Sequence, residues 1–266
     1  MITSYSNKFV KEVIQLNQKA KARNEQDIFV AEGVKMFDEA PVERISKVYL
    51  AKRAEAELRC TYGEKLNRLP VESVADDVFD KMCDTKTPQG ILCLVRQFHY
   101  TIDTILAAVN KNKNLLLIVL EDIQDPGNLG TIFRTCEGAG ADGIIMSNRT
   151  VDVYNPKTIR STMGSVYRMP FLYTDDLCET IRTLKEHDIG VYAAHLDGTK
   201  YYDEFDYCRG TAFLVGNEAN GLKEQTAGCA DDMLKIPMEG NVESLNAAVA
   251  SSILLYEAYR QRRCER

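Results

Sequence analysis

The sequence of 266 residues has little of what several common classes of protein require. No stretch approaches the roughly 18 apolar residues of a membrane span. The first ten residues carry polar side chains where a signal peptide would have its apolar run. No G-x-x-x-x-G-K-[ST] pattern occurs, which excludes a P-loop nucleotide site. We therefore expect a soluble, unprocessed, cytoplasmic protein that makes no membrane contact.

Metal-binding and redox patterns are missing as well. The eight cysteines are scattered singly, and the absence of C-x-x-C spacing argues against a zinc ribbon or a thioredoxin-like pair. Only three histidines occur, His99, His187 and His195, and none forms an H-E-x-x-H pattern. With no export signal, we expect free thiols in a reducing compartment and no metal site.

The composition is that of a globular protein, with 45% hydrophobic and 27% charged residues. Lys and Arg number 33 against 39 for Asp and Glu, and the formal charge of −6 excludes a protein that coats nucleic acid by bulk charge. A local basic surplus does occur near the start of the chain, at Lys8, Lys11, Lys19, Lys21 and Arg23. This surplus is either a site for nucleic acid or a solvated helix face.

Hydrophobic patterning divides the chain into two α/β domains. Residues 1–96 alternate short strands and helices and predict one small domain. Residues 97–113 are expected to be a linker with a short amphipathic helix (Ile102, Ile105, Leu106, Val109) before a polar run. Residues 114–266 contain five apolar runs typical of strands buried on both faces of a parallel sheet. These runs are at 115–120, 143–147, 191–195, 212–215 and 233–236. Helices are expected at 130–137, 177–187 and 244–263, so the sheet is open and mostly parallel.

A literal G-x-G-x-x-G occurs at Gly138–Gly143. A dinucleotide site requires this pattern to follow a strand and to open a helix. Here the glycines follow a helix and lead into a strand, so a helix C-cap and turn explain them better. This placement speaks against a nucleotide-dependent oxidoreductase.

Three polar loops follow predicted strands of the second domain. The first carries Asn128 and leads to Arg134 one turn into a helix, the second carries Glu218, and the third carries Ser244 and Asn246 at the start of the long helix. Ligands bind beyond the carboxyl ends of strands in such sheets. The three loops therefore predict one composite site.

These residues resemble the SpoU, or TrmH-type, RNA 2′-O-ribose methyltransferases of the SPOUT superfamily. Three motifs carry the resemblance, in the family's order and spacing: Asn128-x-Gly130-x-x-x-Arg134, then Gly216-Asn-Glu218-x-x-Gly221-Leu, then Ile236-Pro-Met with Ser244-Leu-Asn246. Phe29-Val-Ala-Glu-Gly33 and Thr87-Pro-Gln-Gly-Ile91 look like the substrate-binding domain of the rRNA-modifying branch. Two departures are Ala219, where members often have Gly, and Ala248, where many have Ser.

The resemblance implies an amino-terminal RNA-binding domain and a SPOUT domain whose carboxy-terminal segment is tied in a trefoil knot. It also implies a homodimer to which the long carboxy-terminal helix contributes, although the apolar stripe of that helix fits core packing equally well. The cofactor implied is S-adenosylmethionine, without a metal. The residues expected to line its pocket are Gly216, Ile236 and Leu245, with Leu214, Asn217 and Met238 adjacent and Asn246 beside them.

The resemblance also assigns roles in catalysis. Arg134 would hold the phosphate of the target nucleotide and stabilise developing alkoxide charge, because a guanidinium with a pKa above about 12 is an implausible base. Asn128 and Asn246 would orient the ribose and Arg134, and Ser244 would bond the nucleotide. Glu218 would either fix Arg134 or brace its loop. We expect RNA contacts from basic side chains in both domains, namely Lys19, Lys21, Arg23, Arg149, Arg160 and Arg168.

The expected substrate is a ribose 2′-hydroxyl of large-subunit (23S) rRNA. A tRNA substrate and a non-catalytic RNA-binding module of the same fold stay open as alternatives.

Overall fold

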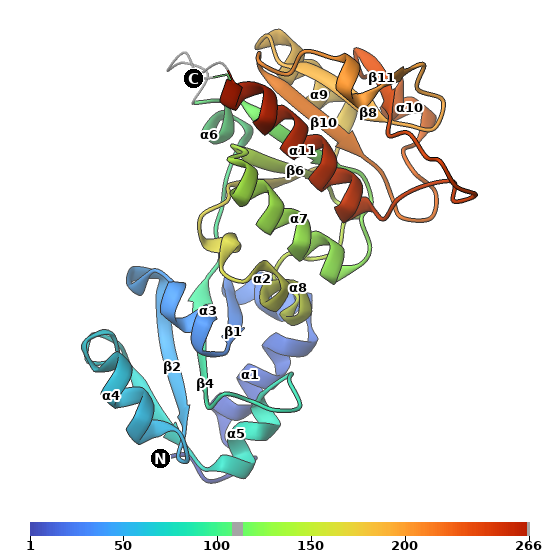
Figure 1. Ribbon diagram of the computed structural model, residues 1–266. Helices are drawn as coiled ribbons and strands as arrows, with labels where there is room; N and C mark the ends of the chain where they lie inside the picture. The colour runs from blue at the N-terminus through green and yellow to red at the C-terminus, as the bar shows by residue number, and fades with distance from the viewer. Residues whose placement is uncertain (108–113, 265–266) are drawn as a thin grey trace. The chain divides into compact units, whose positions relative to one another are not determined.

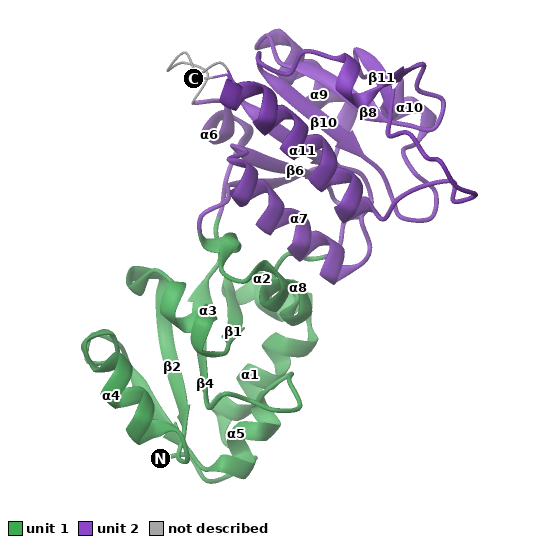
Figure 2. Cartoon of the chain, viewed as in Figure 1, with its two compact units in different colours: residues 1–98, 152–167 green, residues 99–151, 168–266 purple. Residues whose placement is uncertain are grey.

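The computed structural model describes residues 1–107 and 114–264 and divides the chain into two compact units (Figures 1 and 2). Unit 1 comprises residues 1–98 and 152–167, and unit 2 comprises the described residues of 99–151 and 168–266. Within these described ranges, no helix is both long and apolar enough to cross a membrane. Val109 of the expected amphipathic helix lies outside the described residues.

Unit 1 contains a mixed four-stranded sheet in the order β1-β4-β2-β3. β4 pairs antiparallel with β1 and β2, whereas β2 and β3 are parallel. Helices α1 and α5 pack with strand residues such as Val30 and Tyr49 in one core. The elements of unit 1 are α1 (Lys8–Gln18), α2 (Ala20–Gln26), β1 (Ile28–Glu32), α3 (Val34–Glu39), β2 (Ile45–Ala51), α4 (Glu55–Leu66), β3 (Val71–Val74), α5 (Asp76–Met82), β4 (Ile91–Arg96) and α8 (Pro156–Thr162).

Residues 152–167 belong to unit 1 although they follow a strand of unit 2 in the chain. The ring of Tyr154 stacks on Phe29 with centroids 4.8 Å apart, and the Tyr167 hydroxyl donates to the Met36 carbonyl. Asp152 forms an ion pair with the buried Arg23. The predicted domain of residues 114–266 therefore differs from compact unit 2 at residues 152–167. Ring and charge contacts with distant residues of unit 1 hold this segment, and no local sequence pattern predicts such contacts.

Unit 2 is built on a seven-stranded sheet in the order β7-β6-β5-β10-β8-β11-β9, with every neighbouring pair parallel. The expected α/β class with a mostly parallel sheet is confirmed. The elements of unit 2 are α6 (Ile102–Leu106), β5 (Leu116–Leu120), α7 (Pro126–Ala139), β6 (Gly143–Ser147), β7 (Phe171–Thr174), α9 (Leu177–Glu186), β8 (Gly190–Ala194), β9 (Lys200–Tyr201), β10 (Thr211–Val215), α10 (Glu224–Ala227), β11 (Asp232–Lys235) and α11 (Ala247–Cys264).

The inner strand β5 is buried along its whole length, as its apolar sequence predicts. Leu117 and Val119 pack with α6 and α9 in one core. The intervening Leu116 and Ile118 point to the other face by strand alternation. Helices α7 and α11 lie side by side over the sheet (Figure 1) and contact each other extensively. The strands' carboxyl ends are left for the loops that form the site.

Two helix boundaries differ from the sequence-based expectation. Helix α7 begins at Pro126, four residues before the expected start, because the Asp125 side chain caps it and proline fits the first helical position. Asn128 therefore lies in the first turn of α7 rather than in a loop. Helix α11 begins at Ala247, three residues later than expected, since Asn246 is its cap. At the far end of α7, Gly140 is a left-handed C-cap, which confirms the helix end predicted at the glycine-rich stretch.

Candidate functional site

Asn128, Glu218 and Asn246 form one chain of hydrogen bonds, although each comes from a different motif. The Asn128 side-chain amide donates to a Glu218 carboxylate oxygen at 2.9 Å. The Asn246 amide donates to the Asn128 Oδ1, also at 2.9 Å. The Asn246 Oδ1 accepts from the backbone N–H groups of Ala248 and Val249, which caps α11. The structure thus joins the three predicted loops.

Glu218 braces the turn between β5 and α7. Its carboxylate also accepts from the backbone N–H groups of Gln124 and Asp125, at 3.1 and 3.2 Å. Partial burial acts to raise the pKa of Glu218, but these bonds and the one from Asn128 outweigh it and hold the pKa below its ordinary value. Of the two roles expected for Glu218, the contacts correspond to loop bracing, since no bond joins it to Arg134.

A second set of contacts ties the loop of residues 216–222 to the end of β5. The Asn217 side-chain amide donates to the Asp122 carbonyl at 2.7 Å, and Asp122 has a left-handed φ of 55°. Lys223 forms an ion pair with the Asp122 carboxylate at 2.8 Å. The buried Glu121 carboxylate accepts from the Lys223 backbone N–H and from the Thr226 hydroxyl. The loop is therefore held on both of its sides.

A cavity of about 390 Å³ lies beyond the carboxyl ends of β8, β10 and β11. Of the residues expected to line the cofactor pocket, five line this cavity: Gly216, Asn217, Ile236, Met238 and Leu245. Leu214 does not, because it is fully buried in β10, and Asn246 caps α11 instead. Ser244 lines the cavity and is exposed. The sequence reasoning missed the β8 end, including His195 and Leu196, even though 191–195 was a predicted strand whose carboxyl end implied it.

Gly216 is required for a close approach within the protein itself. A Cβ at this position would lie 2.1 Å from the Gly221 carbonyl carbon and 2.2 Å from the Leu222 nitrogen. Both neighbours are backbone atoms, which cannot move aside as a flexible side chain would. The glycine therefore lets the loop close on itself.

Arg134 lies in the third turn of α7 and is exposed. Its guanidinium makes no hydrogen bond or ion pair with the described residues of the chain. It stands outside the Asn128–Glu218–Asn246 chain and outside the cavity lining. Its planar fork is therefore available to an external phosphate or carboxylate.

Comparison with known proteins places this site in a family. Residues 115–256 match the SpoU rRNA methylase family, and residues 7–93 match the MRM3-like substrate binding domain. The chain belongs to the SpoU rRNA methylase family. It is 31% identical over 259 residues to the 23S rRNA (guanosine(2553)-2′-O)-methyltransferase RlmP of Bacillus subtilis, covering 96% of this chain and 97% of that one.

Solved structures agree with this assignment. An rRNA methyltransferase from Sinorhizobium meliloti has a TM-score of 0.83 at 31% identity, covering 97% of this chain and 96% of that one. The SpoU methyltransferase AviRb from Streptomyces viridochromogenes, solved with the cofactor AdoMet, has a TM-score of 0.87 at 26% identity, covering 97% of this chain and 98% of that one. The expected family, enzyme class and cofactor are thereby confirmed.

The cavity fits the cofactor of a SpoU methylase. Its volume lies within the range of about 300–1,000 Å³ that is usual for small-molecule sites. Apolar side chains such as Leu222, Leu234 and Ile236 provide walls for a flat ring, and the carboxylates of Asp197 and Glu243 suit a cationic group. Across the described residues, no group of three or more His, Cys, Asp or Glu side chains is arranged to hold a metal ion.

The basic residues expected to contact RNA occupy different environments. Lys19 and Lys21 are exposed in unit 1. Arg23 differs from them, because only 4% of its side chain is exposed and it donates to Asp152 and to the Leu16 carbonyl. A buried, paired guanidinium serves the fold of unit 1 rather than a ligand. Of the remaining three, Arg149 is exposed in unit 2, Arg160 pairs with Asp84 within unit 1, and Arg168 pairs with Glu137 in unit 2.

The two motifs of the substrate-binding domain meet in unit 1, since β1 and β4 are paired. The Gln89 side chain accepts from the Val34 N–H at 2.9 Å, beside Gly33, whose φ is 103°. The buried Glu32 carboxylate accepts from the Asp84 and Thr85 N–H groups. The motif residues of this domain thus hold its loops in place.

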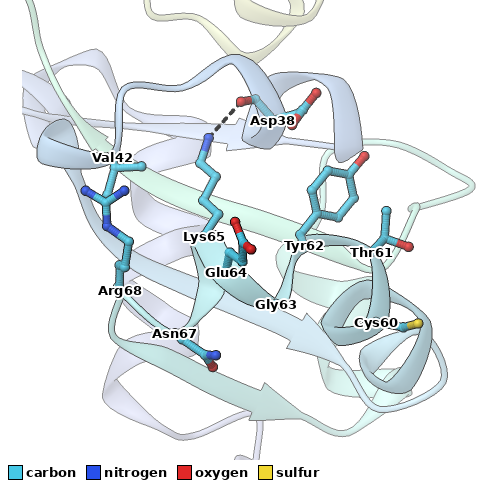
Figure 3. Close-up of a pocket in the computed structure, with 10 residues that line it drawn as sticks. All are labelled: Asp38, Val42, Cys60, Thr61, Tyr62, Gly63, Glu64, Lys65, Asn67 and Arg68. Carbon is cyan, nitrogen blue, oxygen red and sulfur yellow. Dashed lines mark hydrogen bonds between the residues drawn. The ribbon is translucent and has the colours of Figure 1, made fainter.

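A larger hollow of about 740 Å³ in unit 1 lies beside α4 (Figure 3). Its lysine, Lys65, donates to the carbonyls of Phe37, Asp38 and Ala40 at the end of α3. Burial lowers the pKa of Lys65. Because its ammonium already serves α3, this hollow is a weaker candidate for a ligand site than the cavity of unit 2.

Proposed function

We propose that this protein transfers a methyl group from S-adenosylmethionine to a ribose 2′-hydroxyl of 23S rRNA. The observation that carries the proposal is the joining of Asn128, Glu218 and Asn246 by hydrogen bonds, with Glu218 also lining a cavity suited to the cofactor. The full-length similarity to RlmP supports the ribose and the rRNA as targets. The match to a substrate-binding domain over residues 7–93 supports a polynucleotide over a small acceptor.

The chain's own residues would position the nucleotide. When bound, the cofactor supplies an electrophilic methyl group. Arg134 grips the phosphate next to the target ribose and stabilises the charge that develops on its oxygen. Asn128 and Asn246 orient the ribose, and Ser244 bonds the nucleotide from the cavity wall. The 2′-hydroxyl proton leaves late, to water, so most of the acceleration comes from positioning.

RNA would bind through local basic residues of an acidic protein. Lys19, Lys21 and Arg149 offer exposed charges. Arg160 and Arg168 would exchange a carboxylate partner for a phosphate. Because phosphate contacts release counterions, affinity for RNA falls steeply as the salt concentration rises.

The proposal includes a homodimer, a knotted carboxy-terminal segment and a cytoplasmic location. Val249, Tyr256 and Tyr259 are 48%, 48% and 38% exposed along α11, which supports a partner on that helix. Residues between 236 and 245 line the same cavity as the loop of residues 216–222, and this closeness supports the knotted segment. The cytoplasm is where ribosomal RNA is made and folded in bacteria.

The test is methyl transfer with the purified protein and labelled S-adenosylmethionine, using 23S rRNA and tRNA as separate substrates. We expect label in 23S rRNA, located at one ribose by mapping of 2′-O-methyl positions. Transfer to tRNA alone would support the alternative substrate. Calorimetric absence of cofactor binding would instead identify a non-catalytic RNA-binding module.

A further inference from the structure

Two of the eight cysteines have their sulfur atoms in contact. The Sγ atoms of Cys178 and Cys229 lie 2.7 Å apart, although the residues are 51 positions apart in the chain. Both thiols also donate to the Gln225 carbonyl, at 3.6 and 3.2 Å. The sulfurs of a disulfide are about 2.05 Å apart, so bonding these two requires a displacement of less than about 1 Å.

The pair is accessible to a small reagent. Cys178 and Cys229 are both partly exposed, whereas Cys93 and Cys136 are fully buried. Cys60 is exposed and offers an unhindered single thiol for comparison. Because no group of three metal-binding side chains occurs among the described residues, the pair is better explained by sulfur chemistry than by metal binding.

Along the chain, Cys229 lies between two segments that line the cavity of unit 2. Cys178 is the second residue of α9, and Cys229 follows α10. Toward the amino terminus, α10 is preceded by the cavity-lining loop of residues 216–222, and toward the carboxyl terminus Cys229 leads into β11 and Ile236. Cys229 also packs against the core that contains Leu222 and α9. A bond between the sulfurs would fasten the segment between the two walls to α9.

We propose that Cys178 and Cys229 form a reversible thiol–disulfide pair that controls exchange of the cofactor. The oxidant is a low-molecular-weight disulfide, RSSR. One cysteine thiolate attacks RSSR to give a mixed disulfide and one RSH, and the second displaces the remaining RSH. Both protein thiols lose their protons to the two RSH formed, and the Cys178–Cys229 bond takes the place of the RSSR bond.

The surroundings make the reduced pair slow to react rather than inert. Burial, followed by the hydrogen bond and charge of Cys229, raises the pKa of Cys178 to about 11. Asp176 adds to this rise and Arg182 opposes it. The thiol is therefore protonated near neutrality, which suits a site that responds to sustained rather than brief oxidation.

The crosslink is tested on the full-length protein in buffers of reduced and oxidised glutathione. After alkylation of free thiols, non-reducing peptide mapping should find a Cys178–Cys229 linkage at ratios that leave Cys60 alkylated. Cys229→Ser should abolish the linkage, and Cys60→Ser should leave it unchanged. At equilibrium, oxidation of Cys60 at glutathione ratios that leave the pair reduced, or a linkage only between molecules, would overturn the proposal.

The effect on the cavity is tested by the rate of S-adenosylmethionine release from the oxidised and reduced protein. If the cavity walls move apart when the cofactor leaves, a Cys178–Cys229 bond slows that movement. We therefore expect release to be at least about threefold slower after oxidation, and dithiothreitol to reverse the effect. Cys229→Ser should release the cofactor at the reduced rate in both buffers. A complete linkage with unchanged release would overturn the link to the cavity. The peptide mapping does not depend on the proposed function. Failure of the disulfide proposal can therefore be distinguished from failure of the proposed methyltransferase function.

Discussion

The sequence predicted the grouping of residues in the candidate site of unit 2 better than the grouping of basic residues in unit 1. Asn128, Glu218 and Asn246 were expected to act together, and the structure joins them by direct hydrogen bonds. Lys19, Lys21 and Arg23 were also expected to act together, yet two are exposed and the third is buried in an ion pair.

The difference lies in what each kind of ligand demands. A small cofactor needs fixed groups at short distances, so spacing between motif residues carries much of the geometry. An RNA backbone accepts any suitably placed positive charge, and a run of Lys and Arg has the same composition whether a member faces water or the core. Predictions can test how far this contrast extends.

The largest expected effect is at Arg134. Arg134→Ala and Arg134→Lys should each lower methyl transfer by at least roughly a hundredfold, the scale of removing one preorganised electrostatic donor. Lysine keeps the charge but loses the planar fork that grips a phosphate at two points. Cofactor affinity, measured by calorimetry, should be unchanged because Arg134 does not line the cavity. Arg182→Ala, an exposed arginine on α9, is the matched control; equal turnover in the two alanine variants would refute the assignment.

The next effect distinguishes the buried member of the basic group from its neighbours. Arg23→Met should lower the free energy of unfolding by about 2–3 kcal/mol, below the full cost of breaking a buried pair because the Asp152 side chain is 27% exposed. RNA affinity of the folded fraction should not change. Lys21→Met should do the reverse, leaving stability within about 0.5 kcal/mol and weakening RNA binding. Urea unfolding measures the stability of both variants, and RNA binding at a series of salt concentrations measures their affinity. An Arg23→Met variant that is as stable as the wild type but binds RNA poorly would contradict the structure.

Local patterns predicted most strands of the sheet, because a run such as Leu116–Leu120 buried on both faces has one interpretation. They missed β7 (Phe171–Thr174) and the two-residue β9, which lie at the sheet's edges and lack such runs. They also placed residues 152–167 with the second domain. Stacking of Tyr154 on Phe29 joins residues 125 positions apart, a distance no periodicity can bridge.

A smaller effect is expected where the loop of residues 216–222 closes on itself. Gly216→Ala puts a Cβ against the backbone at Gly221 and should displace the loop, lowering cofactor affinity at least about tenfold in calorimetry. Gly240→Ala is the control, since a Cβ there meets nothing within 4 Å. Equal affinities in the two variants would show that the loop's closure does not shape the cavity.

The smallest effect tests whether the bracing by Glu218 is electrostatic. Glu218→Gln should lower the free energy of unfolding at pH 7 by about 1 kcal/mol, a low value for a charged hydrogen bond because the side chain is exposed. Since the pKa of Glu218 is depressed in the folded protein, the contribution is complete above the unfolded pKa of about 4.3 and is lost as the pH falls through the folded value. The difference between the wild type and the variant in urea unfolding should therefore be constant from pH 6 to 7 and shrink below about pH 4.

Glu243→Gln is the matched control, because Glu243 lines the same cavity and forms no hydrogen bond with the described residues. It should differ from the wild type by less than about 0.5 kcal/mol at every pH. If Glu218→Gln behaved like this control, the hydrogen bonds to Gln124, Asp125 and Asn128 would add nothing to stability. The Glu218 carboxylate would then mark where the two loops meet without stabilising their contact. The difference between the two units would rest only on the positions of the motif residues.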